Sequence, residues 1–478
     1  MRSTKTARAA LAIAIASILA ACAVGPDYRR PEPPNVDAFV GVEGAQFNSA
    51  EVEREFWTQF GDPQLNDLIE EALSANHDVR IAMARLREAR ALRGEARLDL
   101  APTVTEQASH VDARASERQV PFTGVDRDQD YYQTSFDAFW ELDFFGRARR
   151  GVEAASAEVQ AAEADLYGTQ VIVTAEVARN YFELRGAQTR LEVARRNAEN
   201  QRESLRLTTT RLEAGRGTQL DVSRAQAQLE ATLGSIPDLE AEVNQAMLRL
   251  AVLTGREPQA LTPELQTAKD LPALPRTHSI GTPETLLRRR PDVVAAERQL
   301  AASTARIGIA VADLFPRISF VGSWGFDAVD SSDLGNSSSE TYAFGPSIRW
   351  AAFDLGRVRQ RIKQREAASE AALARYEQTV LRALEETDVS LTNYAKSLVK
   401  HQHLHASAEA SLEAARIARV RFENGAADFL TVLDAERSAL QAEDALAQSE
   451  TQTATALLAM YKALGGGFRP ISQTASAR

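Results

Sequence analysis

The chain has 478 residues, of which 44% are hydrophobic, 6% aromatic and 25% charged, a composition that supports a large folded core and excludes wholesale disorder. Lys and Arg number 55 against 66 Asp and Glu, giving a net charge of -11. This balance disfavours a nucleic-acid partner, because phosphate binding depends on clustered basic side chains. One cysteine excludes an internal disulfide framework and a cysteine-rich zinc site.

The N-terminus has the pattern of a secretory signal. Basic residues (Arg2, Lys5, Arg8) precede an apolar run over 9–19 that is too short for a spanning helix, which predicts a signal peptide over 1–21 and export from the cytoplasm. The run ends in Leu-Ala-Ala-Cys at 19–22, which resembles the lipobox of bacterial lipoproteins. We therefore expect Cys22 to carry a covalent lipid, and an unmodified cysteine beside an ordinary cleavage site is the alternative.

The mature sequence contains a duplication. At an offset of 214, seven residues of the first half match identical residues of the second: Leu73, Asp78, Val79, Leu86, Asp99, Leu100 and Pro102 fall on Leu287, Asp292, Val293, Leu300, Asp313, Leu314 and Pro316. At an offset of 210 the matches continue, among them Trp140 with Trp350, Arg211 with Arg421, and Gly215 with Gly425. The chain is therefore expected to contain two structural repeats with the same arrangement of elements.

Long helices dominate each half. Residues 357–424 contain no Gly or Pro, and Leu373, Tyr376, Val380, Leu384, Leu391, Tyr394 and Leu398 form a helical apolar stripe. Such a helix extends on the order of 100 Å. Residues 148–214 have a similar helical composition without proline, and shorter helices are predicted over 218–254 and 428–464. Helices of this length predict an elongated bundle or tube.

Four strands are predicted between the helices. They lie at about 103–110 and 131–142 in the first half, and at about 317–328 and 341–351 in the second. The last three have aromatic residues on alternate positions, and the first is a weaker partner without aromatic residues. Their length suits a tilted membrane strand, and a small soluble hairpin sheet is the alternative. Four strands cannot close a membrane barrel, so a membrane role predicts an oligomer.

Several motifs resemble signatures of the outer membrane factor family, the TolC and OprM type channels, and within it the NodT-like lipoproteins. They are CAVGPDYRRP from Cys22, FWTQFGDPQLNDLI at 56–69, RRRPDVVAAERQL at 288–300, ADLFPRISF at 312–320, FDLGRVR at 353–359, FLTVLDAERS at 429–438 and YKALGGG at 461–467. The resemblance covers essentially the whole mature chain. It implies a mainly α, duplicated TolC-like fold in which a homotrimer forms a 12-stranded β-barrel continued by a 12-helix periplasmic α-barrel.

The resemblance also divides the chain. The implied parts are a signal peptide (1–21), a lipidated N-terminal equatorial arm (22–61), a first structural repeat (62–255), an equatorial linker (256–282), a second structural repeat (283–465) and a C-terminal tail (466–478).

The implied function is a passive outer-membrane exit duct of a tripartite efflux system for drugs or other toxic small molecules. Its implied partners are a periplasmic adaptor, an inner-membrane pump of the resistance-nodulation-division (RND) class and outer-membrane lipid. The implied periplasmic aperture is formed by Leu430, Asp434 and Asp221. The implied adaptor-contact tips are Arg211 with Gly215 and Arg421 with Gly425, although both glycines also suit purely structural helix caps.

No enzyme, metal or cofactor function is predicted. The chain has no HExxH, GxSxG or phosphate-binding glycine loop. On a helix, only His401 and His405 of the three histidines at 401, 403 and 405 share a face, and two imidazoles make an incomplete metal site. The rival functions are an export duct for type I protein secretion and, from another class, a lipid-anchored coiled-coil spacer or cell-wall enzyme.

Overall fold

The computed structural model describes residues 23–32, 34, 36, 38–40, 47–116, 118 and 127–470. The chain divides into two units, and each draws on both halves of the duplicated sequence. Unit 1 takes its described residues from Met1–Pro31, Arg85–Ala162 and Ala295–Glu377, and unit 2 takes its own from Glu32–Ala84, Glu163–Val294 and Gln378–Arg478. The predicted signal peptide and Cys22 lie outside the described residues.

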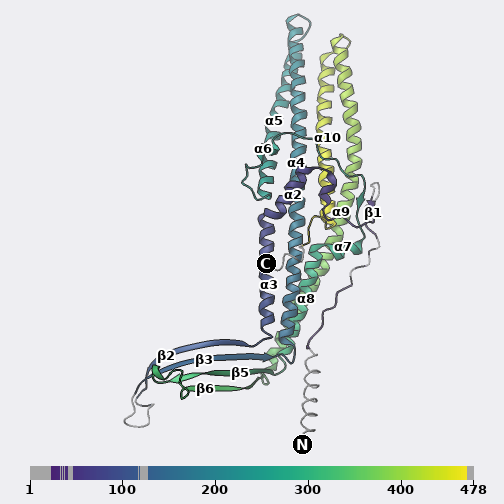
Figure 1. Cartoon of the computed structure of the whole chain (residues 1–478). Helices are drawn as coiled ribbons and strands as arrows, with labels where there is room; N and C mark the ends of the chain where they lie inside the picture. Colours follow the sequence, from purple (N-terminus) through teal and green to yellow (C-terminus); the bar gives the residue numbers. More distant parts are fainter. Residues whose placement is uncertain are drawn as a thin grey trace. The chain divides into compact units, whose positions relative to one another are not determined.

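Unit 1 contains a four-stranded antiparallel sheet in the order β2-β3-β5-β6 (Figure 1). The strands are β2 (Thr103–Arg114), β3 (Asp128–Leu142), β5 (Arg317–Ala328) and β6 (Glu340–Arg349), with a 3-10 turn η2 (Ser331–Asp333) between the last two. In each half of the chain, one helix precedes a pair of strands and a longer helix follows it. In the first half these helices are α3 (His77–Leu98) and α4 (Arg147–Glu213), and in the second half they are α8 (Pro291–Ala312) and α9 (Leu355–Glu423). The four strands lie at the predicted positions, and β2 is four residues longer than expected.

The register of this sheet places the alternating aromatic residues on one face. Phe136 lies opposite Trp324, which in turn lies opposite Tyr342, and Trp140 lies opposite Phe320. These five side chains are 38–72% exposed. Among the described residues, β2 pairs only with β3 and β6 only with β5. One chain therefore leaves an apolar face and two open sheet edges.

The two halves connect helix to strand in the same way. The indole Nε1 of Trp140 donates to the carbonyl of Leu100 at 2.9 Å, and that of Trp350 donates to the carbonyl of Leu314 at 3.0 Å. Each carbonyl belongs to the residue two positions before a proline, Pro102 or Pro316, and the strand begins directly after that proline. The pairs are equivalent under the sequence duplication, so the repeat preserves a tertiary contact as well as a composition.

Unit 2 is built around two helical hairpins, α4 with α5 (Gln219–Leu253) and α9 with α10 (Phe429–Ala463). All four helix predictions are confirmed to within two residues. The apolar stripe of α9 is also confirmed, since Tyr376, Val380, Leu384, Leu391 and Tyr394 are at most 9% exposed. The shorter elements are β1 (Phe47–Asn48), η1 (Phe56–Phe60), α2 (Pro63–Ala75), α6 (Thr262–Leu265), β4 (His278–Ser279) and α7 (Pro283–Arg289).

The sequence Gly-Asp-Pro at 61–63 starts α2. Gly61 has φ +63° and ends η1, the Asp62 carboxylate accepts the backbone N–H groups of Gln64 and Leu65, and Pro63 occupies the first helical position. The other oxygen of Asp62 accepts the Tyr181 hydroxyl at 2.7 Å. This turn therefore fixes the N-terminal arm to α4.

Three segments distant in sequence meet beside the hairpins. β1 and β4 pair in parallel and join the arm to the linker, while the Gly467 N–H donates to the Arg54 carbonyl at 2.7 Å and joins the tail to the arm. Phe56, which is fully buried, stacks on Tyr461 of α10 at 4.8 Å between ring centroids.

His278 is the buried centre of this region, with 1% exposure. Gln59 donates its amide to Glu53, so its carbonyl oxygen accepts the Tyr461 hydroxyl at 3.1 Å. The Tyr461 oxygen then accepts from His278 Nδ1 at 3.1 Å, and His278 Nε2 accepts the Tyr394 hydroxyl at 2.7 Å. The network assigns the proton of a neutral imidazole to Nδ1. Burial lowers the pKa of His278 to about 4.

We predict that His278 makes the protein sensitive to mild acid. Unfolded His binds its proton near pH 6.5, so its contribution to stability is complete above that pH and falls by about 2 kcal/mol on reaching pH 5. Between pH 7.5 and 5, the melting temperature of the detergent-solubilised wild type should fall further than that of His278→Phe. His403→Phe, which replaces an exposed histidine of α9, is the control, and an equal fall in all three proteins would contradict the prediction.

Candidate functional site

The two hairpin turns have the same backbone geometry. Gly215 has φ +70°, its N–H donates to the Leu212 carbonyl, and the Arg216 N–H donates to the Arg211 carbonyl. Gly425, with φ +75°, and Ala426 form the equivalent pair of bonds. Both are Schellman caps, in which glycine is needed for its left-handed conformation. The structural role of the two glycines is therefore established, and their contact with an adaptor stays a prediction.

The helices after the two turns, α5 and α10, each begin with a hydrogen bond between a hydroxyl and a carboxylate, with the two residue types in opposite order. Thr218 caps α5 and donates its hydroxyl to the Asp221 carboxylate at 2.6 Å, whereas Asp428 caps α10 and accepts the Thr431 hydroxyl at 2.6 Å. At the 210-residue offset, Thr218 corresponds to Asp428 and Asp221 to Thr431. The same hydroxyl–carboxylate pair thus occurs twice with its residues exchanged, and a search for identical residues misses it. The hydrogen bonds from Thr431 lower the pKa of Asp428.

Arg211 and Arg421, predicted as equivalent adaptor contacts, differ in environment. Arg211 is half-buried, donates to the Phe422 carbonyl at 3.0 Å, and lies 3.9 Å from the centre of the Phe422 ring. It therefore caps the last turn of α9 from the other hairpin. Arg421 is exposed.

An apolar cluster joins the hairpins just behind the turns. Phe422 and Phe429 lie 5.5 Å apart, and the buried members of the cluster are Ala225, Ala418, Phe422, Phe429 and Val432. Leu430, the predicted apolar residue of the aperture, is 45% exposed and lies outside this cluster.

Two carboxylates on α10 have opposite environments. The Glu436 side chain is 9% exposed and accepts from Arg419 of α9 at 2.5 Å and from Ser204 of α4 at 3.1 Å. The Asp434 side chain is 64% exposed and pairs with Arg437 of its own helix. Sequence reasoning identified Asp434 and missed Glu436, whose partners are 17 and 232 residues away.

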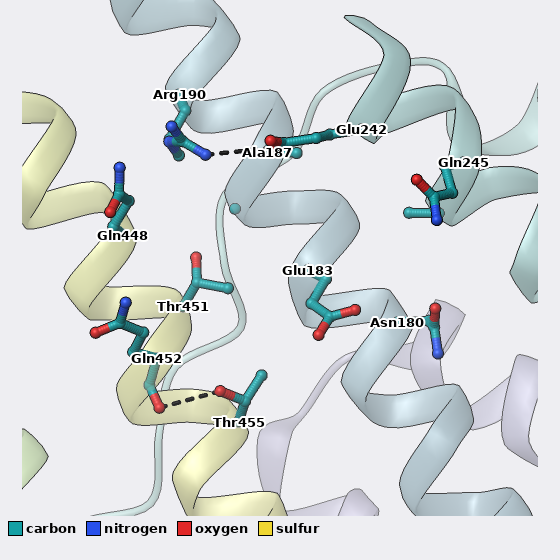
Figure 2. A pocket seen from close by; sticks show the side chains of 12 residues that line it. Asn180, Glu183, Ala187, Arg190, Glu242, Gln245, Gln448, Thr451, Gln452 and Thr455 are labelled. Atoms are coloured by element: carbon teal, nitrogen blue, oxygen red, sulfur yellow. Dashed lines mark hydrogen bonds and ion pairs between the residues drawn. The ribbon is translucent and has the colours of Figure 1, made fainter. Parts of the chain in front are cut away.

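Further along the same helices lies a polar groove of about 420 Å³ between α4, α5 and α10 (Figure 2). Arg190 bridges its walls, pairing with Glu242 at 3.2 Å and Asp444 at 2.7 Å. A Cβ atom on Gly186 would lie 2.0 Å from the Thr451 hydroxyl, so α4 and α10 cross closely here. Burial raises the pKa of Glu183 in this groove.

The described residues that follow the predicted lipidation site, Cys22, make contacts within unit 1. The Val24 N–H donates to the Phe145 carbonyl at 3.1 Å, and Arg150 pairs with Asp27 at 2.6 Å. A Cβ atom on Gly146 would lie 2.6 Å from Ala23. The residue after Cys22 is therefore held against the junction between β3 and α4.

Glu297 anchors the next part of this arm. It is 2% exposed, accepts the Tyr28 hydroxyl at 3.0 Å, and pairs with Arg30 at 3.1 Å. The motif CAVGPDYRRP thus supplies two partners for one buried carboxylate.

The described residues contain no group of three His, Cys, Asp or Glu side chains able to hold a metal ion. Within the same residues, no helix is both long and apolar enough to cross a membrane.

Comparisons with known proteins agree with this architecture. The family model of the outer membrane efflux protein matches residues 68–256 and 282–466. The chain belongs to this family. It is 32% identical to the outer membrane protein OprJ of Pseudomonas aeruginosa over 465 residues, covering 96% of this chain and 95% of OprJ, and 28% identical to nodulation protein T of Rhizobium leguminosarum bv. trifolii, covering 95% and 97%.

The solved structure of the outer-membrane channel OprN superimposes with a TM-score of 0.86 at 46% identity, covering 93% of this chain and 99% of OprN. The efflux protein therefore has the duplicated TolC-like fold, and the resemblance drawn from its sequence motifs is confirmed.

We predict that Glu436 stabilises the efflux protein and that Asp434 does not. Glu436→Ala removes charge-assisted hydrogen bonds at a buried site and should lower the free energy of unfolding by about 2 kcal/mol. Asp434→Ala removes an exposed ion pair and should change it by less than about 0.5 kcal/mol. Chemical denaturation of the detergent-solubilised proteins measures both values. Equal losses would contradict the assignment of the two carboxylates.

Proposed function

We propose that this outer membrane efflux protein is a passive exit duct that carries small toxic molecules from a periplasmic adaptor and an inner-membrane RND pump to the exterior. The observation that supports the proposal best is the incomplete sheet of unit 1. An open sheet edge leaves backbone N–H and C=O groups without hydrogen-bond partners. In lipid, each unpaired group raises the free energy by several kcal/mol. Three copies remove every edge by closing a 12-stranded barrel.

The aromatic face of the sheet supports an outer-membrane location for that barrel. Phe136, Trp324 and Tyr342 lie in one row across three strands and are exposed in the single chain. Outward apolar bands with aromatic borders are the mark of membrane barrels. The two helical hairpins of each chain then supply a 12-helix tube in the periplasm.

Leu430, Asp434 and Asp221 form the proposed aperture of this tube. The first two are exposed in the single chain, so three copies can bring them together as an apolar ring and a carboxylate ring about a common axis. A ring of carboxylates attracts cations and repels anions. No reacting group is required, so the duct acts without catalysis.

The hairpin turns are the proposed adaptor contacts. Gly215 and Gly425 fix the shape of the two tips, and the exposed Arg421 supplies a positive charge. Arg211 supports this surface indirectly by capping α9.

The proposed lipid on Cys22 fits the position of the arm. Ala23 and Val24 are bound beside the end of β3, where the proposed barrel meets the helices. Acyl chains attached to the preceding residue can therefore enter the inner leaflet of the outer membrane, adding about 0.8 kcal/mol for each buried methylene.

Conductance in planar bilayers tests the duct. Wild-type trimer should give a low, cation-selective conductance, and Asp434→Ala should reduce the selectivity or raise the conductance because it removes the carboxylate ring. Glu413→Ala is the matched control, since Glu413 also forms an exposed i,i+3 pair with an arginine. A folded trimer that forms no channel would refute the proposal.

Metabolic labelling with palmitate tests the anchor. Wild type should be labelled and Cys22→Ser should not, while the unlabelled variant should stay in the membrane through carbonate extraction because the barrel holds it. A chain with an ordinary secretory signal joined to Ala23 controls for incomplete processing of Cys22→Ser. Unlabelled wild type contradicts the anchor, and release of both variants contradicts the barrel.

A further inference from the structure

A second cavity in unit 2 has no part in the proposed duct. Its volume is about 850 Å³, within the range of small-molecule sites, and it lies where the linker passes α9 and α10. The segment 270–276 forms one wall with the half-buried side chains of Leu271, Pro272, Leu274 and Pro275. The opposite wall includes Leu398 of α9 and Ala454 of α10. Much of the cavity therefore suits an apolar group.

Glu450 of α10 provides a negative charge in this cavity. The side chain is half-buried, and burial raises the pKa of its carboxyl group, while His401 and His405 act in the opposite direction. Within the part of the chain that the structure describes, no donor forms a hydrogen bond or ion pair with the Glu450 carboxylate. A poorly hydrated carboxylate of this kind gains from a cationic partner.

His401 of α9 lines the same cavity and has a buried ring nitrogen, Nδ1, without a hydrogen-bond partner among the described residues. A buried polar atom without a hydrogen-bond partner destabilises the folded protein. The neutral ring with its proton on Nε2 offers a lone pair at Nδ1. In this tautomer His401 offers an acceptor in the same cavity as the Glu450 carboxylate, and neither group has a hydrogen-bond donor among the described residues.

We propose that this cavity binds a small amphipathic amine, a primary or secondary ammonium carrying an apolar group. The ammonium donates hydrogen bonds to Glu450 and His401, and the apolar group lies against the 270–276 segment. An anionic ligand is disfavoured, because the lining holds the carboxylates of Glu450 and Asp270 against the single guanidinium of Arg276. This site does not depend on conduction through the duct.

The ligand also has a structural consequence. His278 and Tyr394, which hold the linker to α9, line the same cavity. A bound amine contacts both the linker and the helices, so it should stabilise their association by mass action.

Four probes with one apolar ring separate the contributions of charge and N–H donors. They are cyclohexylmethylamine, its trimethylammonium analogue, cyclohexylmethanol and cyclohexanecarboxylate. Binding to the full-length protein in nanodiscs is measured by calorimetry at pH 8, where an imidazole is neutral. The amine should bind at least tenfold more tightly than each of the others and should raise the melting temperature.

Variants then place the amine in the cavity. Glu450→Gln, which keeps the shape of the side chain, should weaken amine binding at least tenfold, and His401→Leu at least threefold. Glu183→Gln is the matched control and should bind as wild type does, since Glu183 is another half-buried carboxylate with a raised pKa but lines the other groove.

The proposal is overturned if the alcohol binds as tightly as the amine, if no probe binds, or if both cavity variants bind the amine as wild type does. Circular dichroism checks the fold of each variant. If Glu450→Gln does not fold, His401→Leu and the comparison of the amine with its trimethylammonium analogue decide the outcome. Conductance is recorded on the same preparations, so failure of this site and failure of the duct are distinguishable.

Discussion

The two outer strands of the four-stranded sheet, β2 and β6, each have one unpaired edge in the described chain. The aromatic face between them is exposed. Neither feature is stable in a single chain, because the edges need hydrogen-bond partners and the face needs an apolar environment. Association through the edges satisfies the first need, and lipid satisfies the second. The proposed trimer in the outer membrane meets both with one arrangement.

Duplication explains how one chain supplies matched parts to such an assembly. Trp140 and Trp350 bind equivalent carbonyls before equivalent strands, and the two hairpins end in the same glycine cap. The hydroxyl–carboxylate hydrogen bonds at the starts of α5 and α10 show that the two halves share a contact even where the residues at equivalent positions differ. A hydroxyl and a carboxylate three residues apart cap the helix in either order, so the residues are exchanged while the contact is kept.

Local patterns in the sequence were sufficient for the four long helices, the positions of the four strands and the family. The absence of Gly and Pro over 357–424 predicted α9, and Gly425 predicted its end, because both signals act within a few residues. The Tyr394–His278–Tyr461 network and the partners of Glu436 were not predicted, since they join positions more than one hundred residues apart or on different helices. Arg211 shows the same limit: its match to Arg421 suggested equal roles, but only the fold places the Phe422 carbonyl beside it.

The positions of Asp434 and Glu436 follow from helix geometry. Successive residues turn by about 100° around an α-helix, so side chains two apart differ by about 200° and point in nearly opposite directions. When Glu436 faces Ser204 and Arg419 in the interior, Asp434 must face away from it, which agrees with their exposures of 9% and 64%. The interior carboxylate holds three helices together, and the outer one contributes little to that packing. The charge at the proposed aperture can therefore change by substitution at Asp434 without loss of the contact that positions α10.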